Sequence, residues 1–109
     1  MIKLMLVDDE PQITTMLEKW FTKTKEFSVS VYNNPEVALS SFSTSKPDVV
    51  LLDIMMPQMD GIAVLEKIKS IDESAVVIMM TAYSTLDRVL SSHRQGADSY
   101  ILKDRKSVV

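Results

Sequence analysis

Several side chains capable of chemistry stand directly after strand-like runs of mostly apolar residues. The runs cover residues 3–7, 49–52, 76–80 and 100–102, and the polar residues that follow them are Asp8, Asp9, Asp53, Thr81 and Lys103. In a parallel sheet covered by helices, ligands bind where the carboxyl ends of the strands meet. We therefore expect carboxylates, a hydroxyl and an ammonium group to gather at one edge of a sheet, an arrangement that would hold a divalent cation beside a phosphoryl group.

The three aspartates of this set indicate a site for a hard cation. Asp8 and Asp9 are adjacent, and two carboxylates at one edge repel each other unless a cation or a lysine offsets their charge. With Asp53 added, the donors are all oxygen atoms, which suits Mg²⁺ better than Zn²⁺. The alternative is that Asp8 and Asp9 only cap the first helix. Asp53 could also act as a nucleophile toward phosphorus, which would give an acyl phosphate.

The loop after Asp53 and the end of the next strand supply further groups. Pro57 stiffens this loop, and Gly61 gives the backbone freedom at the entry to the next helix, so the loop could hold a backbone carbonyl near a metal. Thr81 and the amide of Ala82 can donate hydrogen bonds to phosphoryl oxygens, and the lysine of the set can add a positive charge to the same group.

Composition excludes several other functions. The chain has 109 residues, of which 46% are hydrophobic and 25% charged, and its formal net charge is −3. A nucleic-acid interface is not expected at this charge, and the one small basic cluster is Lys103, Arg105 and Lys106. Because there is no cysteine, disulfides, thiol catalysis and cysteine-ligated metals are excluded. No apolar stretch is long enough to span a membrane and no signal peptide precedes the first strand, so we expect a cytoplasmic location.

Helix-like segments separate the strand-like runs. The first of them repeats apolar residues at helical spacing: Ile13, Met16, Leu17, Trp20 and Phe21. We expect helices to begin at Pro11, after the N-cap residue Asn34, near Gly61 and at Ser84, and the last of these to end at Gly96.

The order of these segments predicts the fold class. Residues 27–32 alternate apolar and polar side chains, as a half-exposed edge strand does. Strands and helices alternate along the whole chain, which favours right-handed crossovers and a mainly parallel sheet in a single α/β domain over residues 1–109.

The sequence resembles the receiver domain of two-component response regulators over residues 2 to about 103. The residues that carry the resemblance are the pair Asp8-Asp9, the motif Asp53-x-x-x-Pro57-x-x-Asp60-Gly61, the pair Thr81-Ala82, and Lys103. The resemblance implies a flavodoxin-like doubly wound sheet of five parallel strands in the order 2-1-3-4-5, which is the order found in chemotaxis receivers.

The resemblance also assigns a metal site. It implies that Asp53 is the phosphoacceptor and takes a phosphoryl group from the phosphohistidine of a histidine kinase or phosphotransfer protein. It implies that Asp9, Asp53 and the carbonyl of Met55 bind Mg²⁺ directly, and that Asp8 acts through water.

The remaining roles concern the phosphoryl group and the switch. By resemblance, Lys103 pairs with a phosphoryl oxygen or with Asp53 before phosphorylation. Thr81 would move toward the phosphoryl group and draw Tyr100 inward, a population shift between two arrangements. An output domain or a downstream protein outside this chain would respond to the change.

Two departures from the family pattern concern the end of the chain. Asp104 follows Lys103 where the family has proline with a cis peptide bond, so we expect this bond to be trans. The chain ends at Val109, too early for the fifth helix of the family. Three interpretations remain open: a piece of a longer protein, a dimer that covers the sheet face left bare, or a minimal receiver.

Three functions follow from these patterns. The first is a phosphoacceptor switch whose only chemistry is Mg²⁺-dependent self-phosphorylation and slow self-dephosphorylation, so that the chain is not an enzyme with external substrates. The second is a pseudo-receiver, a binding module that keeps the fold without using phosphate. The third is a phosphohydrolase with an aspartyl nucleophile, but such an enzyme needs an acid two residues after the nucleophile, and this position is Met55.

Overall fold

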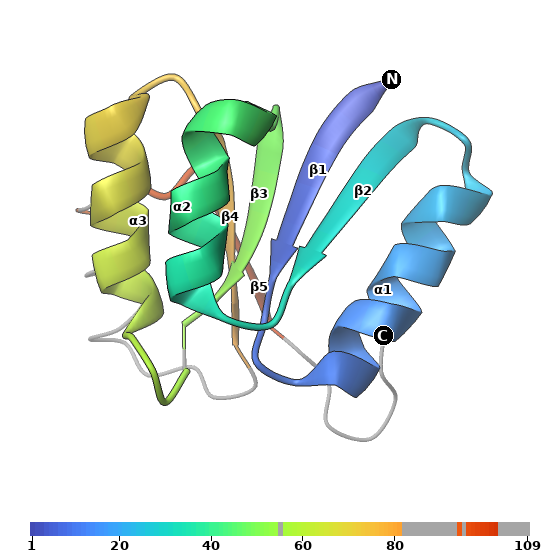
Figure 1. Cartoon of the computed structure of the whole chain (residues 1–109), viewed down its shortest axis with the longest axis horizontal. Helices are drawn as coiled ribbons and strands as arrows, with labels where there is room; N and C mark the ends of the chain where they lie inside the picture. The colour runs from blue at the N-terminus through green and yellow to red at the C-terminus, as the bar shows by residue number, and fades with distance from the viewer. Residues whose placement is uncertain (55, 82–93, 95, 103–109) are drawn as a thin grey trace.

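The computed structural model describes residues 1–54, 56–81, 94 and 96–102, and in this part of the chain the strands form one parallel sheet. The strands are β1 (Ile2–Val7), β2 (Phe27–Tyr32), β3 (Val49–Asp53), β4 (Val76–Thr81) and β5 (Ser99–Leu102). Their order across the sheet is β2-β1-β3-β4-β5 (Figure 1). All four pairings are parallel, so the predicted doubly wound α/β fold and its strand order are confirmed.

Burial of the strands follows their position in the sheet. The central strand β3 is buried at every position from Val50 to Asp53, as expected for a parallel strand covered on both faces. The edge strand β2 pairs only with β1 among the described strands, and its Ser28 and Ser30 are exposed. The alternation along residues 27–32 therefore predicted the edge strand correctly.

Three described helices connect the strands, and each begins where the sequence predicts. Helix α1 (Pro11–Lys23) has Pro11 in its first turn, and α3 (Gly61–Ile71) begins at Gly61. Helix α2 (Pro35–Ser45) has Asn34 as its N-cap, and the Asn34 side chain accepts hydrogen bonds from the backbone N–H groups of Glu36 and Val37. These bonds satisfy donors that the first helical turn leaves without a partner.

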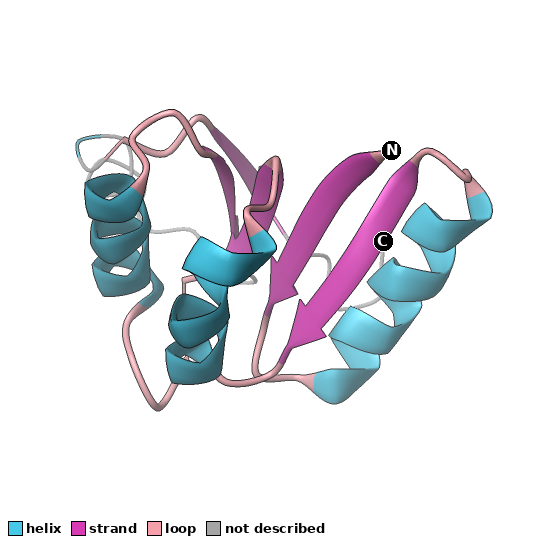
Figure 2. Ribbon diagram, turned by 45° about the horizontal axis from the view of Figure 1, so that its top comes forward, coloured by secondary structure: helices cyan, strands magenta, loops and turns pink. Residues whose placement is uncertain are grey.

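The helices cover the two faces of the sheet, as Figure 2 shows. Helices α2 and α3 lie side by side over a core that includes Met5, Phe42, Leu52 and Leu65. On the other face, the partly buried side chains of α1 pack with those of β1 and β2: Leu4, Leu6, Leu17, Phe21, Phe27 and Val29. The apolar spacing in α1 over-predicts burial at Trp20, which is 61% exposed and makes an edge contact with Phe21 at 4.9 Å between ring centroids.

Several predictions concern residues outside the described part of the chain. They are the helix expected from Ser84, the peptide bond between Lys103 and Asp104, and the truncated fifth helix after Lys103. The single-domain boundary at 1–109 likewise stays a prediction. Among the helices that the structure describes, none is long and apolar enough to cross a membrane.

Candidate functional site

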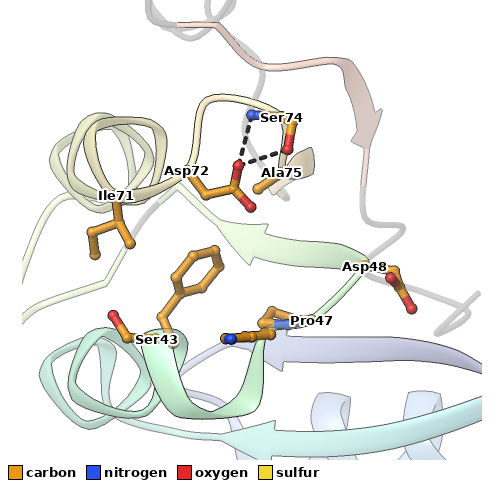
Figure 3. Close-up of a pocket in the computed structure, with 9 residues that line it drawn as sticks. Ser43, Pro47, Asp48, Ile71, Asp72, Ser74 and Ala75 are labelled. Atoms are coloured by element: carbon orange, nitrogen blue, oxygen red, sulfur yellow. Dashed lines mark hydrogen bonds between the residues drawn. The ribbon is translucent and has the colours of Figure 1, made fainter.

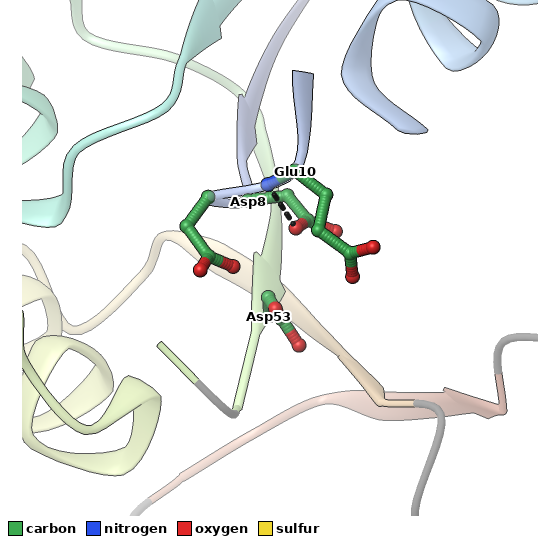
Figure 4. Close-up of side chains that lie close together, drawn as sticks. Asp8, Glu10 and Asp53 are labelled. Atoms are coloured by element: carbon green, nitrogen blue, oxygen red, sulfur yellow. Dashed lines mark hydrogen bonds between the residues drawn. The ribbon is translucent and has the colours of Figure 1, made fainter. Parts of the chain in front are cut away.

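Four carboxylates meet at the carboxyl edge of the sheet. Asp8, Asp9, Glu10 and Asp53 each offer one oxygen atom, and these oxygens all lie within 4.8 Å of one another. Figure 4 shows the side chains of Asp8, Glu10 and Asp53 converging from the ends of β1 and β3. The structure therefore brings together the three aspartates that the sequence singled out and adds Glu10, which sequence reasoning missed although it directly follows the acidic pair.

The sheet itself places the aspartates. Strands β1 and β3 are parallel neighbours, with Val7 opposite Leu52, so Asp8 and Asp53 are the next residues at the same edge. Both are almost completely buried, at 0% and 1% exposure. A buried carboxylate is stable only where hydrogen bonds, an opposite charge or a metal compensates for its lost hydration. Two buried carboxylates side by side therefore fit a site that holds a cation.

The cluster fits a hard divalent cation by donor type and by spacing. Every donor is a carboxylate oxygen, which Mg²⁺ and Ca²⁺ prefer. Two oxygens on opposite sides of a Mg²⁺ ion lie about 4.2 Å apart, because each Mg–O bond is about 2.1 Å long. The limit of 4.8 Å within the cluster is close to this span, so the spacing is compatible with oxygen atoms that share one cation.

The backbone and its neighbours hold Asp8 in place. The N–H of Glu10 donates to Asp8 Oδ1 at 3.0 Å, and the N–H of Asp8 donates to the carbonyl of Tyr32 at 3.1 Å. Helix α1 begins directly after this turn, with Glu10 as an N-cap residue whose side chain makes no capping hydrogen bond. The alternative in which Asp8 or Asp9 is the helix cap is therefore wrong for the N-cap position.

A side-chain bridge behind Asp8 was also missed. Asn33 Nδ2 donates to the carbonyl oxygen of Asp8 at 2.8 Å and to Thr14 Oγ1 at 3.0 Å. Thr14 is buried, and its hydroxyl donates to the carbonyl of Pro11 at 3.1 Å. The bridge joins the β2–α2 turn to the β1–α1 turn. In the sequence Asn33 shows only the signal of a turn residue, because its partner lies 25 positions away.

Gly61 controls the loop that follows Asp53. Its N–H donates to the carbonyl of Ile54 at 2.9 Å. A Cβ atom at Gly61 would lie 2.1 Å from the Asp53 carbonyl oxygen and 2.7 Å from Ile54 Cα. From the sequence, Gly61 is predicted to provide backbone freedom. The structure shows a different reason for glycine at this position, because the start of α3 lies very close to the end of the strand that carries Asp53.

The other predicted site residues are only partly described. Thr81 is the last residue of β4 and lies opposite Leu102, while Tyr100 in β5 lies opposite Met79. The backbone at Thr81 follows Met80, which lies opposite Asp53, so β4 ends at the edge where the carboxylates meet. The side chains of Thr81 and Tyr100, and all of Met55, Ala82 and Lys103, lie outside the described part.

A pocket of about 470 Å³ lies at the opposite edge of the sheet, where β3 and β4 begin (Figure 3). Its carboxylates already hold local hydrogen bonds. Asp72 Oδ1 accepts from the N–H of Ser74 at 3.0 Å and from its hydroxyl at 2.6 Å, and Asp48 Oδ2 accepts from the N–H of Lys3 at 2.8 Å. The two hydrogen bonds from Ser74 lower the pKa of Asp72. We assign no chemistry to this pocket, which is remote from the carboxylate cluster.

Comparison with known proteins identifies the family. The family model for the response regulator receiver domain matches residues 4–108. The chain belongs to this family. It is 39% identical over 101 residues to sporulation initiation phosphotransferase F of Bacillus subtilis, covering 93% of this chain and 81% of that protein. It is 38% identical over 104 residues to chemotaxis protein CheY of Listeria monocytogenes, covering 94% and 87%.

Solved receiver structures have the same fold. The response regulator TrrA of Thermotoga maritima, crystallised in complex with Mg²⁺ and BeF, matches with a TM-score of 0.86 and 34% identity over 96% of this chain and 89% of TrrA. The chain spans only about a fifth of the length of two other relatives, the regulatory protein AtoC of Escherichia coli (39% identical, 22% of its length) and the regulator NtrC of Klebsiella pneumoniae (40%, 21%). The receiver domain described here is therefore a phosphoacceptor module of two-component signalling, which in such relatives is one part of a longer protein.

Proposed function

We propose that this receiver domain takes a phosphoryl group onto Asp53 from the phosphohistidine of a histidine kinase or phosphotransfer protein, with Mg²⁺ as cofactor. The observation that carries the proposal is the position of Asp53. Its carboxylate is buried at the end of the central strand β3 and lies within 4.8 Å of the oxygens of Asp8 and Asp9. The order of the motifs in the family supports the same residue.

The residues proposed to hold Mg²⁺ are Asp8, Asp9, Asp53 and the backbone carbonyl of Met55. The donor set of the three aspartates fits the cation, and the presence of Mg²⁺ in the related TrrA structure supports the choice. When bound, Mg²⁺ neutralises the charge of the carboxylates and of the phosphoryl oxygens. Glu10 lies close enough to add a further carboxylate to the same site.

The proposed transfer step has a simple balance. An Asp53 carboxylate oxygen forms a bond to phosphorus while the bond from phosphorus to the imidazole nitrogen of the donor breaks. The electron pair of that bond stays on the nitrogen, which takes a proton. Asp53 is only 1% exposed, so little bulk water competes with the phosphoryl donor for its carboxylate.

The groups proposed to bind the phosphoryl oxygens are Thr81, the amide of Ala82 and Lys103. Support comes from the strand register, because Thr81 lies opposite Leu102 at the same edge as Asp53, and Lys103 is the next residue in the sequence. We propose that Thr81 and Tyr100 then shift together, and that an output domain or partner protein recognises the changed surface.

The proposal includes no turnover of external substrates. The residue two positions after Asp53 is Met55, which cannot act as the proton donor that an aspartyl phosphohydrolase requires. The chemistry left to the domain is self-phosphorylation from phosphodonors and slow self-dephosphorylation. We place this activity in the cytoplasm, where histidine kinases present their phosphohistidine.

The decisive experiment is intact mass spectrometry after incubation with Mg²⁺ and a small acyl phosphate. We expect one phosphoryl adduct on the wild-type chain, none on Asp53→Asn, and none when a chelator removes Mg²⁺. Asp48→Asn is the matched control, because it makes the same chemical change at the opposite edge of the sheet, where the residue is exposed. An unmodified wild-type chain in a folded sample would favour the pseudo-receiver, a binding module that does not use phosphate.

A second experiment tests the metal residues. Thermal unfolding should shift upward with added Mg²⁺, because a ligand that binds only the folded state adds about 2.7 kcal/mol of stability at 100 times its dissociation constant. We expect Asp8→Ala to lose most of this shift and Asp48→Asn to keep it. An undiminished shift in both Asp8→Ala and Asp53→Asn would contradict the assignment of the metal site.

A further inference from the structure

The ammonium group of Lys69, near the end of α3, gathers oxygen atoms from two separate segments. Lys69 Nζ donates to the carbonyl of Ala75 at 2.6 Å, to Asp98 Oδ2 at 3.1 Å and to the carbonyl of Glu73 at 3.5 Å. An ammonium has three N–H donors, so these contacts use its full capacity. The Lys69 side chain is 17% exposed and that of Asp98 is 45% exposed, so solvent screens the ion pair in part, and the two carbonyl contacts add to the hold on the ammonium.

Asp98 in turn binds strand β4 with both backbone and side chain. Its N–H donates to the carbonyl of Val77 at 2.9 Å, and its Oδ2 accepts from the N–H of Val77 at 2.9 Å. The next residue, Ser99, begins β5 opposite Ile78. Asp98 therefore extends the β4–β5 ladder by one residue at its start, and the same Oδ2 atom receives the Lys69 ammonium.

The stem of Lys69 also fits the turn that precedes Asp98. Gly96 has a φ of +101°, and a Cβ atom there would lie 3.5 Å from Lys69 Cε and 3.6 Å from Cγ. The aliphatic part of Lys69 thus lies close beside this turn while its charged end contacts Asp98. The contacts join the end of α3, the start of β4 and the start of β5 into one unit.

Strand β5 depends on this unit more than the other strands do. It has four residues and pairs with β4, its one neighbour in the described sheet. We infer that Lys69 and Asp98 are positioning residues that fix the start of β5, and through it the phosphoryl-binding end of the strand beside Thr81. The inference rests on the proposed function in one respect, because Lys103, which directly follows β5, is there assigned to the phosphoryl group.

The positioning role separates two measurable properties. The carboxylates proposed to bind the cation lie directly after β1 and at the end of β3, and these strands pair with each other and not with β5. Loss of the Lys69–Asp98 contact should therefore leave Mg²⁺ affinity unchanged while it loosens β5 and slows uptake of the phosphoryl group. A general loss of stability would change both the Mg²⁺ affinity and the rate of phosphoryl uptake, or neither.

The test uses Asp98→Ala and Lys69→Met, with Lys69→Arg as the conservative variant that keeps the donor. Lys67→Met is the matched control, because it removes an exposed lysine from the same helix. In Asp98→Ala and Lys69→Met, we expect amide hydrogen exchange over residues 99–102 to accelerate roughly tenfold or more, as loss of a charge-assisted hydrogen bond implies. Phosphoryl uptake should slow by a comparable factor, Mg²⁺ affinity should stay within about twofold, and Lys69→Arg should restore both rates.

The outcomes distinguish this inference from the proposed function. Unchanged exchange over residues 99–102 in Asp98→Ala would overturn the positioning role, whatever the phosphorylation result. Faster exchange with an unchanged uptake rate would overturn the link from β5 to the phosphoryl group. If the wild-type chain takes up no phosphoryl group, the proposed function fails. The positioning of β5 is then still decided by the exchange rates of the variants.

Discussion

Replacing Gly61 with alanine tests how closely α3 approaches the strand that carries Asp53. Helix propensity alone predicts stabilisation, since alanine is favoured over glycine by up to about 1 kcal/mol in a helix. The structure predicts the opposite sign. The added Cβ would lie 2.1 Å from the Asp53 carbonyl oxygen, 2.7 Å from Ile54 Cα and 2.9 Å from the Asp53 carbonyl carbon, whereas non-bonded heavy atoms prefer about 3.5–4.0 Å.

The magnitude follows from what must move. All three crowded atoms belong to the backbone, so no side-chain rotation relieves the contact, and α3 must retreat from the strand by an ångström or more. Overpacking of this kind costs about 1–3 kcal/mol, and we expect a value near the upper end because the neighbour is a central strand. At about 4 °C per kcal/mol for a domain of this size, the melting temperature should fall by on the order of 10 °C.

The assay measures thermal and urea unfolding of Gly61→Ala by circular dichroism, with Glu66→Ala as the matched control. Glu66 is exposed on the same helix, so its replacement adds an alanine without crowding the strand, and we expect a change within about 0.5 kcal/mol. Mg²⁺ affinity should also fall in Gly61→Ala, because the displaced backbone carries Asp53. A Gly61→Ala chain as stable as the wild type, with unchanged Mg²⁺ affinity, would refute the close approach.

Three further predictions concern residues around the site and the sheet. Asn34→Ala should lower the free energy of unfolding by about 1 kcal/mol, since the side chain caps α2; urea unfolding measures this, and Asn34→Asp should retain most of the stability. Asn33→Ala should cost about 1 kcal/mol by removing the hydrogen bond that Asn33 donates to the Asp8 carbonyl. It should also weaken Mg²⁺ binding in a titration; equal affinity would show that the bridge does not position Asp8. Partial burial raises the pKa of Asp98, but hydrogen bonds from Val77 and Lys69 and the charge of Lys69 outweigh it, so the net pKa lies below 3.8. The contribution of Asp98 to stability is therefore complete above pH 3.8 and is lost as the pH falls through the lowered pKa. In acid unfolding, the free energy of unfolding of Asp98→Asn should fall less steeply with pH than that of the wild type. Parallel falls in the two chains would contradict this.

The sequence alone determined the strands, the starts of the described helices and the edge where the acids meet. Apolar runs, the proline at position 11 and the cap at Asn34 act over a few residues, so they can be interpreted locally. A parallel sheet brings the ends of its strands to one edge, and this general rule placed Asp8, Asp9 and Asp53 together before any distance was known. Trp20 shows the limit of such patterns. Its spacing places it on the apolar face of α1, but spacing cannot tell how much of that face the sheet covers.

Only the tertiary structure decided the contacts between distant segments. Lys69 and Asp98 are 29 positions apart, and Asn33 reaches Asp8 across 25. No local pattern marks either pair, since each residue alone resembles an ordinary surface or turn residue. The same holds for Gly61, whose role is set by the Asp53 backbone beside it, and for Glu10, which joins the cluster because of the turn into α1. Local propensity fixes the elements, but the geometry of a site depends on how those elements pack, and packing is a property of the whole chain.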